Sequence, residues 1–362
     1  MERRRNTEGK SIRPVNWYCV LAVILCILIV AVIFLLVIWD KLPEFAYQTI
    51  KENITTEEVW SRDSLREGIA TVIEHDKQYI AYVSSEEEAR QVIREYGIRQ
   101  RGKYSNPPVE KIELQMEKDF DILAVNLGEI DEETAKDIQK AFSYMYEAYP
   151  QLYGTITNLS LGNFENAKAG NIAVTQNTEF IINEEFGRYP FVVKYEIILN
   201  AAKFRNRKKL LRDCECQVET GYWPEGSDIT SIVVHELGHQ LLNVIAMQQF
   251  GLETFYYITE ENEEAYSRYV TDQLSVNQNV ARMVLEKAYD IWKHEYYYTG
   301  TEEEFRSSIS GYARGEQADG GISYGETFAE AVADVYLNKE AAADASKAVV
   351  QSIYQYCRKE PK

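Results

Sequence analysis

Basic residues are scarce in this chain, and their distribution is uneven. The 362 residues include 39 lysines and arginines against 57 aspartates and glutamates, which gives a formal net charge of −18. Residues 1–16 hold five of the basic residues, so the rest of the chain carries 34 basic and 55 acidic residues, a net charge of −21. A body this acidic repels phosphate backbones and anionic lipid headgroups. We therefore expect no nucleic-acid ligand.

Several familiar functional motifs are also missing. The chain contains no phosphate-binding glycine loop, no dinucleotide-binding fingerprint and no nucleophilic serine elbow. Its five cysteines do not make a disulfide framework: Cys19 and Cys26 fall in an apolar run, and Cys214, Cys216 and Cys357 fall outside it. One disulfide among the last three is chemically possible in an oxidising compartment, and the sequence leaves its pairing open.

One long apolar run stands out near the N-terminus. The 23 residues from Trp17 to Trp39 carry no charge, and as a helix they would span about 34 Å, enough to cross a bilayer core of about 30 Å. Basic residues precede the run, so the positive-inside rule places the N-terminus in the cytoplasm and everything after Asp40 outside. A cleaved signal peptide is the alternative, but Ile38–Lys41 lacks the small residues of a cleavage site. We expect an uncleaved, single-pass anchor in the cell membrane.

The sequence divides into four parts: a basic cytoplasmic tail, a transmembrane anchor, a membrane-proximal segment with a linker, and a main domain, at residues 1–16, 17–39, 40–108 and 109–362. In the main domain, apolar alternation predicts a strand at Ile112–Met116, and Asp131 is a natural N-cap for the next helix. Further strands are predicted at Thr155–Leu161, Ile172–Thr175, Glu179–Ile182 and Phe191–Asn200. From Asp228 onwards the pattern is mostly helical. Strands followed by helices indicate an α+β fold.

The most informative segment is His-Glu-Leu-Gly-His at residues 235–239, which follows a helix start at Ser227 or Asp228. On a helix, His235 and His239 leave the same face about 6 Å apart, close enough for two imidazoles to bind one Zn²⁺. Glu236 lies beside them and is placed to act as a base toward water on the metal. A chance match is the alternative. Two of only four histidines fall here, however, on an apolar helix where an unpaired imidazole pair would be costly.

A catalytic zinc needs a third protein ligand, and a second helix offers one. Glu326 and Glu330 lie four residues apart on a helix that is otherwise small and apolar. Glu326 has an alternative role, because Ser323 three residues earlier would let it close a capping box. A rival third ligand lies in the acidic run Glu260–Glu264, which also reads as a solvated charge cluster.

Together, His-Glu-Leu-Gly-His and the later Gly-Glu-Thr-Phe-Ala-Glu-Ala at residues 325–331 resemble the gluzincin metallopeptidases. Within that family the pair looks most like the catalytic domain of anthrax lethal factor and related bacterial and phage-encoded domains. The resemblance implies a zincin-like domain over residues 109–362, with a small mixed sheet and helices. It also implies that Glu326 is the third zinc ligand, that Glu236 is the general base, and that Glu330 orients a ligand.

The same family places a tyrosine shortly before the ligand glutamate, where it stabilises the oxyanion of the transition state. The matching segment here is Ser-Gly-Tyr-Ala at residues 310–313, which makes Tyr312 the candidate. The segment between Tyr312 and Glu326, Arg314–Tyr324, is longer than the corresponding segment in the family pattern. Tyr324 is the alternative.

These features predict a membrane-anchored zinc endopeptidase that acts outside the membrane on a protein or peptide substrate. The alternative is a catalytically silent zinc-binding surface or interaction protein of a mobile element or of a secretion or conjugation apparatus. An extended substrate would lie along a sheet edge, and we predict Tyr195–Asn200 as that edge, with an interior strand as the alternative. His294 is expected to be a surface or packing residue, and neither a role for His75 nor an oligomeric state is predicted.

Overall fold

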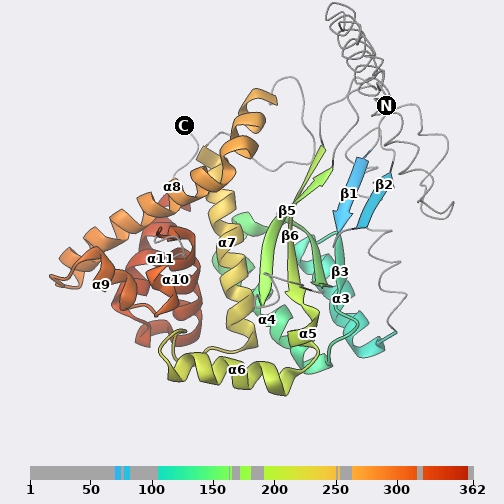
Figure 1. Ribbon diagram of the computed structural model, residues 1–362, viewed down its shortest axis with the longest axis horizontal. Helices are drawn as coiled ribbons and strands as arrows, with labels where there is room; N and C mark the ends of the chain where they lie inside the picture. Colours follow the sequence, from blue (N-terminus) through green and yellow to red (C-terminus); the bar gives the residue numbers. More distant parts are fainter. Residues whose placement is uncertain are drawn as a thin grey trace, which may run out of the picture. The chain divides into compact units, whose positions relative to one another are not determined.

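The computed structural model describes residues 70–74, 77–81, 105–162, 164, 172–180, 191–249, 252, 263–315 and 321–357 (Figure 1). The predicted anchor at 17–39, His75 and the side chains of Glu260–Glu264 lie outside this part of the chain. Among the described helices, none is long and apolar enough to cross a membrane.

A six-stranded mixed sheet forms one part of the domain, with the strand order β2-β1-β5-β6-β4-β3. The strands are β1 (Ala70–Glu74), β2 (Lys77–Ala81), β3 (Ala124–Asn126), β4 (Ile156–Gly162), β5 (Ala173–Phe180) and β6 (Phe191–Asn200). β3, β4 and β6 run parallel, whereas β6, β5, β1 and β2 pair antiparallel in turn. The expected small mixed sheet with mostly helices around it is confirmed. Because β1 and β2 join this sheet, part of the segment 40–108 contributes to it.

Helices make up most of the remaining described chain. They are α3 (Pro107–Phe120), α4 (Glu132–Ala148), α5 (Ala201–Phe204), α6 (Arg207–Glu219), α7 (Ile229–Gln249), α8 (Glu263–Glu295), α9 (Glu302–Ser307), α10 (Tyr324–Asn338) and α11 (Asp344–Cys357), with short 3₁₀ turns η2 (Pro150–Leu152), η5 (Tyr312–Arg314) and η6 (Lys339–Ala341). As Figure 1 shows, α7 stands between the sheet and the C-terminal helices: it packs against β5 and α4 on one side and α10 and α8 on the other.

Three predicted strands need correction. Ile112–Met116 lies inside α3, because its buried residues Val109, Ile112, Met116 and Phe120 follow helical spacing while Leu114 is 50% exposed. Residues at alternating positions were apolar, but the buried set has a helical period. The predictions at Ile172–Thr175 and Glu179–Ile182 merge into the single strand β5.

The strand at Tyr195–Asn200 is confirmed, but its predicted place at a sheet edge is wrong, and the alternative of an interior strand is the one observed. It is the second half of β6, which lies between β4 and β5 in the sheet. Ile197, Ile198 and Leu199 are all buried, so both faces of the strand are covered. An uninterrupted apolar run is typical of an interior strand that is covered on both faces.

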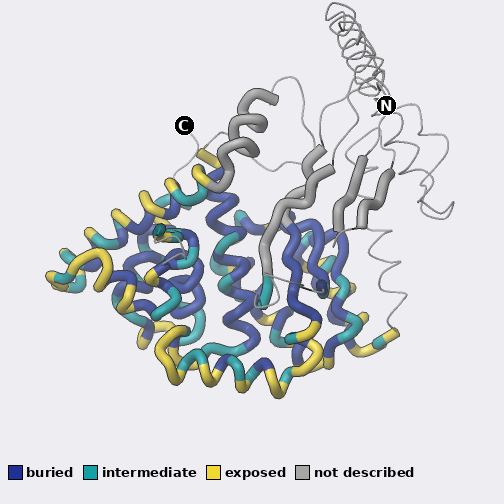
Figure 2. The backbone as a smooth tube through the Cα atoms, viewed as in Figure 1, coloured by how far each residue is buried: buried dark blue, intermediate teal, exposed yellow. Residues whose placement is uncertain are grey.

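α7 is buried along most of its length, as Figure 2 shows. A helix that is apolar on nearly all sides belongs in a protein core. Gly238 permits a close contact with α10, because a Cβ built there would lie 3.0 Å from the Cα of Ala329. The element that approaches α7 closely at Gly238 is therefore α10.

This contact yields a matched pair of glycine substitutions. Gly238→Ala forces α7 and α10 apart, and we expect it to lower the free energy of unfolding by about 1–3 kcal/mol. A Cβ on Gly325 would meet no atom closer than 3.6 Å, so Gly325→Ala should leave that free energy unchanged or raise it. Urea denaturation of both variants measures the difference. Equal stability of the two variants would contradict the close approach.

Candidate metal centre

The start of α7 fixes the orientation of the helix that carries both histidines. Asp228 Oδ1 accepts a hydrogen bond from the Ser231 N–H at 2.9 Å, and the Asp228 N–H donates to Ser231 Oγ at 2.9 Å. These two reciprocal hydrogen bonds give partners to the backbone N–H groups of Asp228 and Ser231, which the helix itself leaves unpaired. Of the two predicted N-caps, Asp228 makes the capping contacts.

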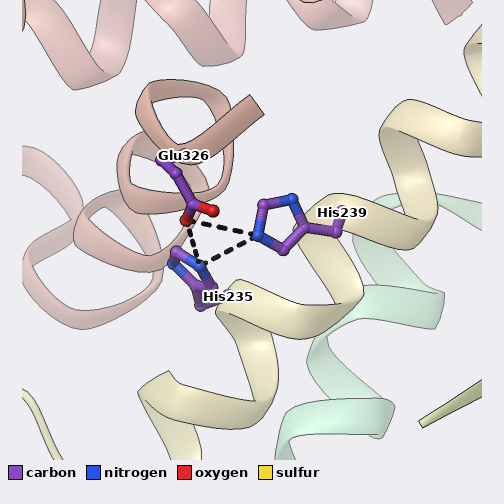
Figure 3. A group of neighbouring side chains, drawn as sticks. All are labelled: His235, His239 and Glu326. Atoms are coloured by element: carbon purple, nitrogen blue, oxygen red, sulfur yellow. Dashed lines mark hydrogen bonds and ion pairs between the residues drawn. The ribbon is translucent and has the colours of Figure 1, made fainter. Parts of the chain in front are cut away.

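His235 and His239 from α7 meet Glu326 from α10 in a compact triangle (Figure 3). His235 Nε2 lies 3.1 Å from His239 Nε2 and 3.2 Å from Glu326 Oε2, and His239 Nε2 lies 3.4 Å from the same oxygen. Around a tetrahedral ion with bonds of about 2.0–2.1 Å, neighbouring donor atoms lie roughly 3.3–3.4 Å apart. The three residues therefore fit a metal ion in both spacing and donor type. Two imidazoles and one carboxylate came together as the sequence predicted.

Glu330 supports this triangle from behind. Its Oε1 lies 2.9 Å from His235 Nδ1, the ring nitrogen that faces away from the other two residues of the triangle. The contact is a close electrostatic one, since it lacks the alignment of a hydrogen bond. Glu330 is only 4% exposed. A carboxylate behind a ligating imidazole fixes the ring orientation and raises the basicity of the nitrogen on the metal side.

Opposite charges stabilise the buried groups. Burial alone would lower the pKa of His235, but the carboxylates of Glu326 and Glu330 outweigh it and hold the pKa well above its ordinary value. Burial alone would raise the pKa of Glu326, yet the imidazoles of His239 and His235 hold it well below its ordinary value. Each shift reflects the neighbouring opposite charge. A metal ion between the same atoms competes with the proton on His235.

The capping box that was the alternative role for Glu326 at the start of α10 does not form. Ser323 occupies the N-cap position but makes no side-chain capping bond. Instead Gln278 on α8 accepts a hydrogen bond from the Tyr324 N–H at 2.8 Å and donates to Ser323 Oγ at 3.3 Å. The Glu326 carboxylate is thus left to face the histidines. Sequence reasoning missed Gln278, because a glutamine 46 residues away gives no local signal.

Of the two candidate tyrosines, Tyr312 is the one whose ring lies against the triangle. Its ring stacks on that of His235, with centroids 5.8 Å apart and planes 22° apart. Burial, followed by the negative charge of Glu326, holds the pKa of Tyr312 well above its ordinary value. Tyr324 is the first residue of α10, and its side chain packs against the hydrophobic core.

A second tyrosine near the site was not predicted. The ring of Tyr222 lies 5.2 Å from that of Tyr312, and the side chain is 43% exposed. Burial and then the carboxylates of Glu326 and Glu330 raise its pKa. Its carbonyl accepts the Tyr312 N–H at 2.9 Å, and the Gly221 carbonyl accepts the Gly311 N–H at 2.8 Å. The loop between α6 and α7 therefore supports the turn that holds Tyr312.

The remaining predicted residues take different positions. Glu236 is 8% exposed and sits on α7 next to His235. His294, near the end of α8, is exposed at the surface, as expected. Cys214, Cys216 and Cys357 are all free, so the possible disulfide among them is not formed.

The geometry predicts one divalent transition-metal ion per chain. His239→Ala and Glu326→Ala each remove a donor and should abolish tight binding, whereas Glu330→Gln should weaken affinity about 10–100-fold by releasing His235. His294→Ala is the matched control and should keep full metal content. Elemental analysis and competition with a chromogenic chelator measure both quantities. Full metal content in the Glu326→Ala protein would exclude Glu326 as a ligand.

Comparison with known proteins adds no further identification: no protein-family model, curated protein or solved structure matches this chain.

Proposed function

We propose that this protein is a zinc-dependent endopeptidase of the gluzincin type with a zincin-like catalytic domain. The observation that carries the proposal is the triangle of His235, His239 and Glu326, with Glu236 next to the first histidine on the same buried helix. Two imidazoles and one carboxylate form a donor set typical of catalytic zinc, which takes three protein ligands and keeps one position open. Zinc held there would act as a Lewis acid and lower the pKa of water.

In this proposal Glu236 is the general base. A carboxylate adjacent to the ligands can accept a proton from the attacking water and pass it to the leaving amine. Glu330 holds the His235 ring through Nδ1, so that Nε2 stays directed at the ion. Each of these residues acts from a buried, packed helix, which limits its movement during the reaction.

Tyr312 is proposed as the donor to the developing oxyanion. Its phenol is protonated at neutral pH, because even the ordinary tyrosine pKa of about 10 lies well above 7, so the hydroxyl is able to donate a hydrogen bond. A fixed donor aimed at developing negative charge stabilises the transition state more than the ground state. Its stacking on His235 places the ring beside the ion site.

We further propose that the apolar run at 17–39 anchors the chain in the cell membrane. The basic residues before it would keep the N-terminus in the cytoplasm, which leaves the metal centre on the outer side. Substrates would then be proteins or peptides outside the cytoplasm.

The role of Glu236 can be separated from metal binding. Glu236→Gln keeps the size of the side chain but removes the base, so zinc content should stay at one ion per chain while peptide hydrolysis falls by roughly 10² or more. Glu225→Gln, the same change at an exposed residue, should leave hydrolysis unchanged. Hydrolysis of a quenched fluorescent peptide library together with elemental analysis measures both. Zinc binding without hydrolysis by the unaltered protein would favour the silent interaction protein.

β5 is the strand along which we propose the substrate lies. It packs against α7, and its only described pairing on the side away from β6 is Phe180 with Val72 of β1. The Asn200 N–H donates to the Ile172 carbonyl, so pairs 174/198 and 176/196 exchange hydrogen bonds within the ladder. The N–H and C=O of Thr175 therefore point away from β6. An extended peptide could pair with them.

Two proline substitutions test this proposed substrate strand. Thr175→Pro removes an outward N–H and should raise KM for peptides while folding and zinc content are retained. Gln176→Pro removes a ladder hydrogen bond to β6 and should destabilise the domain. Circular dichroism, zinc content and steady-state kinetics separate the two. A Thr175→Pro protein that is folded and has an unchanged KM would rule out β5 as the substrate strand.

A further inference from the structure

We infer that Ser310 is a positioning residue that couples the Tyr312 turn to the metal ligand His235 through Glu330. The inference rests on the proposed function for its catalytic consequence, but its structural part does not depend on catalysis. It adds to the site a residue whose described hydrogen bonds join Glu330 to the Ala313 N–H.

The Ser310 hydroxyl both donates and accepts a hydrogen bond. It donates to Glu330 Oε2 at 2.8 Å and accepts the Ala313 N–H at 2.9 Å. Ser310 is 5% exposed, and both hydrogen bonds are buried. Buried hydrogen bonds to a charged acceptor are short and strongly directional, so this serine holds a defined rotamer.

The two carboxylate oxygens of Glu330 contact different residues, one the metal ligand His235 and the other Ser310. Oε1 faces His235 Nδ1 at 2.9 Å, while Oε2 receives the Ser310 hydroxyl. One buried carboxylate therefore supports both a metal ligand and the turn η5. Tyr312 begins that turn, and its ring returns to stack on His235. A continuous series of contacts therefore links His235 to Glu330, Glu330 to Ser310, and the Ser310 turn back to His235 through the stacked ring of Tyr312.

Other contacts hold the turn without reaching Glu330. The backbone of Gly311 and Tyr312 pairs with that of Gly221 and Tyr222, and Thr327 Oγ1 donates to the Ala313 carbonyl at 2.5 Å. These contacts should keep the turn folded when the Ser310 hydroxyl is removed. Loss of that hydroxyl therefore leaves the turn folded but no longer fixed to the carboxylate behind His235.

Such a loss should misplace the phenol without removing the metal. We expect Ser310→Ala to lower kcat about 10-fold, because a small displacement of a catalytic donor costs rate while peptide binding is unchanged. Zinc affinity should change less than about 3-fold, well below the loss expected for Glu330→Gln. Ser308→Ala, which removes a hydroxyl that bonds only to the Phe305 carbonyl among the described contacts, is the matched control.

A double-mutant cycle tests whether Ser310 acts through Tyr312. In the Tyr312→Phe background, Ser310→Ala should produce no further fall in kcat, because the donor that it positions is already gone. Independent, multiplying effects of the two substitutions would overturn the coupling. Rescue of kcat by Ser310→Thr, which retains the hydroxyl, would support it.

A second measurement does not require activity. With 3-fluorotyrosine incorporated at position 312, the ¹⁹F resonance of the full-length zinc-loaded protein should shift in Ser310→Ala and stay in place in Ser308→Ala. An unshifted resonance in Ser310→Ala would overturn the inference. If the unaltered protein hydrolyses no peptide, the proposed function fails, and this ¹⁹F comparison still decides the position of the turn.

Discussion

The packing of α7 against α10 is the contact on which the rest of the site depends. α7 supplies two imidazoles and α10 supplies two carboxylates, and the three candidate metal ligands come to within 3.4 Å of one another. Gly238 allows this distance, because any side chain there would meet the backbone of Ala329. The small residues of α10 and the glycine of α7 are therefore as necessary to the centre as its ligands are. Because protein interiors are close-packed, a displacement of α10 is transmitted directly to α7.

Burial of charge is the second constraint. Glu330 is buried and the His235 side chain is only 12% exposed, and an ionised group in such surroundings is very costly without a partner. The structure compensates by placing carboxylates on both sides of the His235 ring, one toward the metal position and one behind it. This arrangement holds a positive charge between the carboxylates, whether it is carried by a proton or by a metal ion. Such a site is typical of a functional centre, because a core without one would favour apolar residues at these positions.

The environment of Tyr312 is assembled from three separate segments. The loop before α7 supplies backbone partners, α10 supplies Thr327 and Glu330, and the tyrosine's own turn supplies Ser310. Gly311 is required at the meeting point, since a Cβ there would lie 2.9 Å from the Gly221 carbonyl oxygen. The ring is thus held against His235 by the surrounding structure, although only the short 3₁₀ turn η5 carries it. A donor that is fixed before substrate binds needs no reorganisation during the reaction.

The sequence by itself determined the features that depend on local periodicity. A spacing of four residues places His235 and His239 on one face of any α-helix, and the same spacing relates Glu326 to Glu330. An N-cap at Ser227 or Asp228 followed from equally local chemistry, and the structure selects Asp228. Which strand is interior, which glutamine caps α10, and which tyrosines approach the metal position were decided only by the tertiary structure. Gln278, Tyr222 and Ser310 act across large sequence separations, and β6 is interior because β4 and β5 flank it. The period of a segment limits which of its faces is buried, but the chain's long-range packing selects what lies against that face.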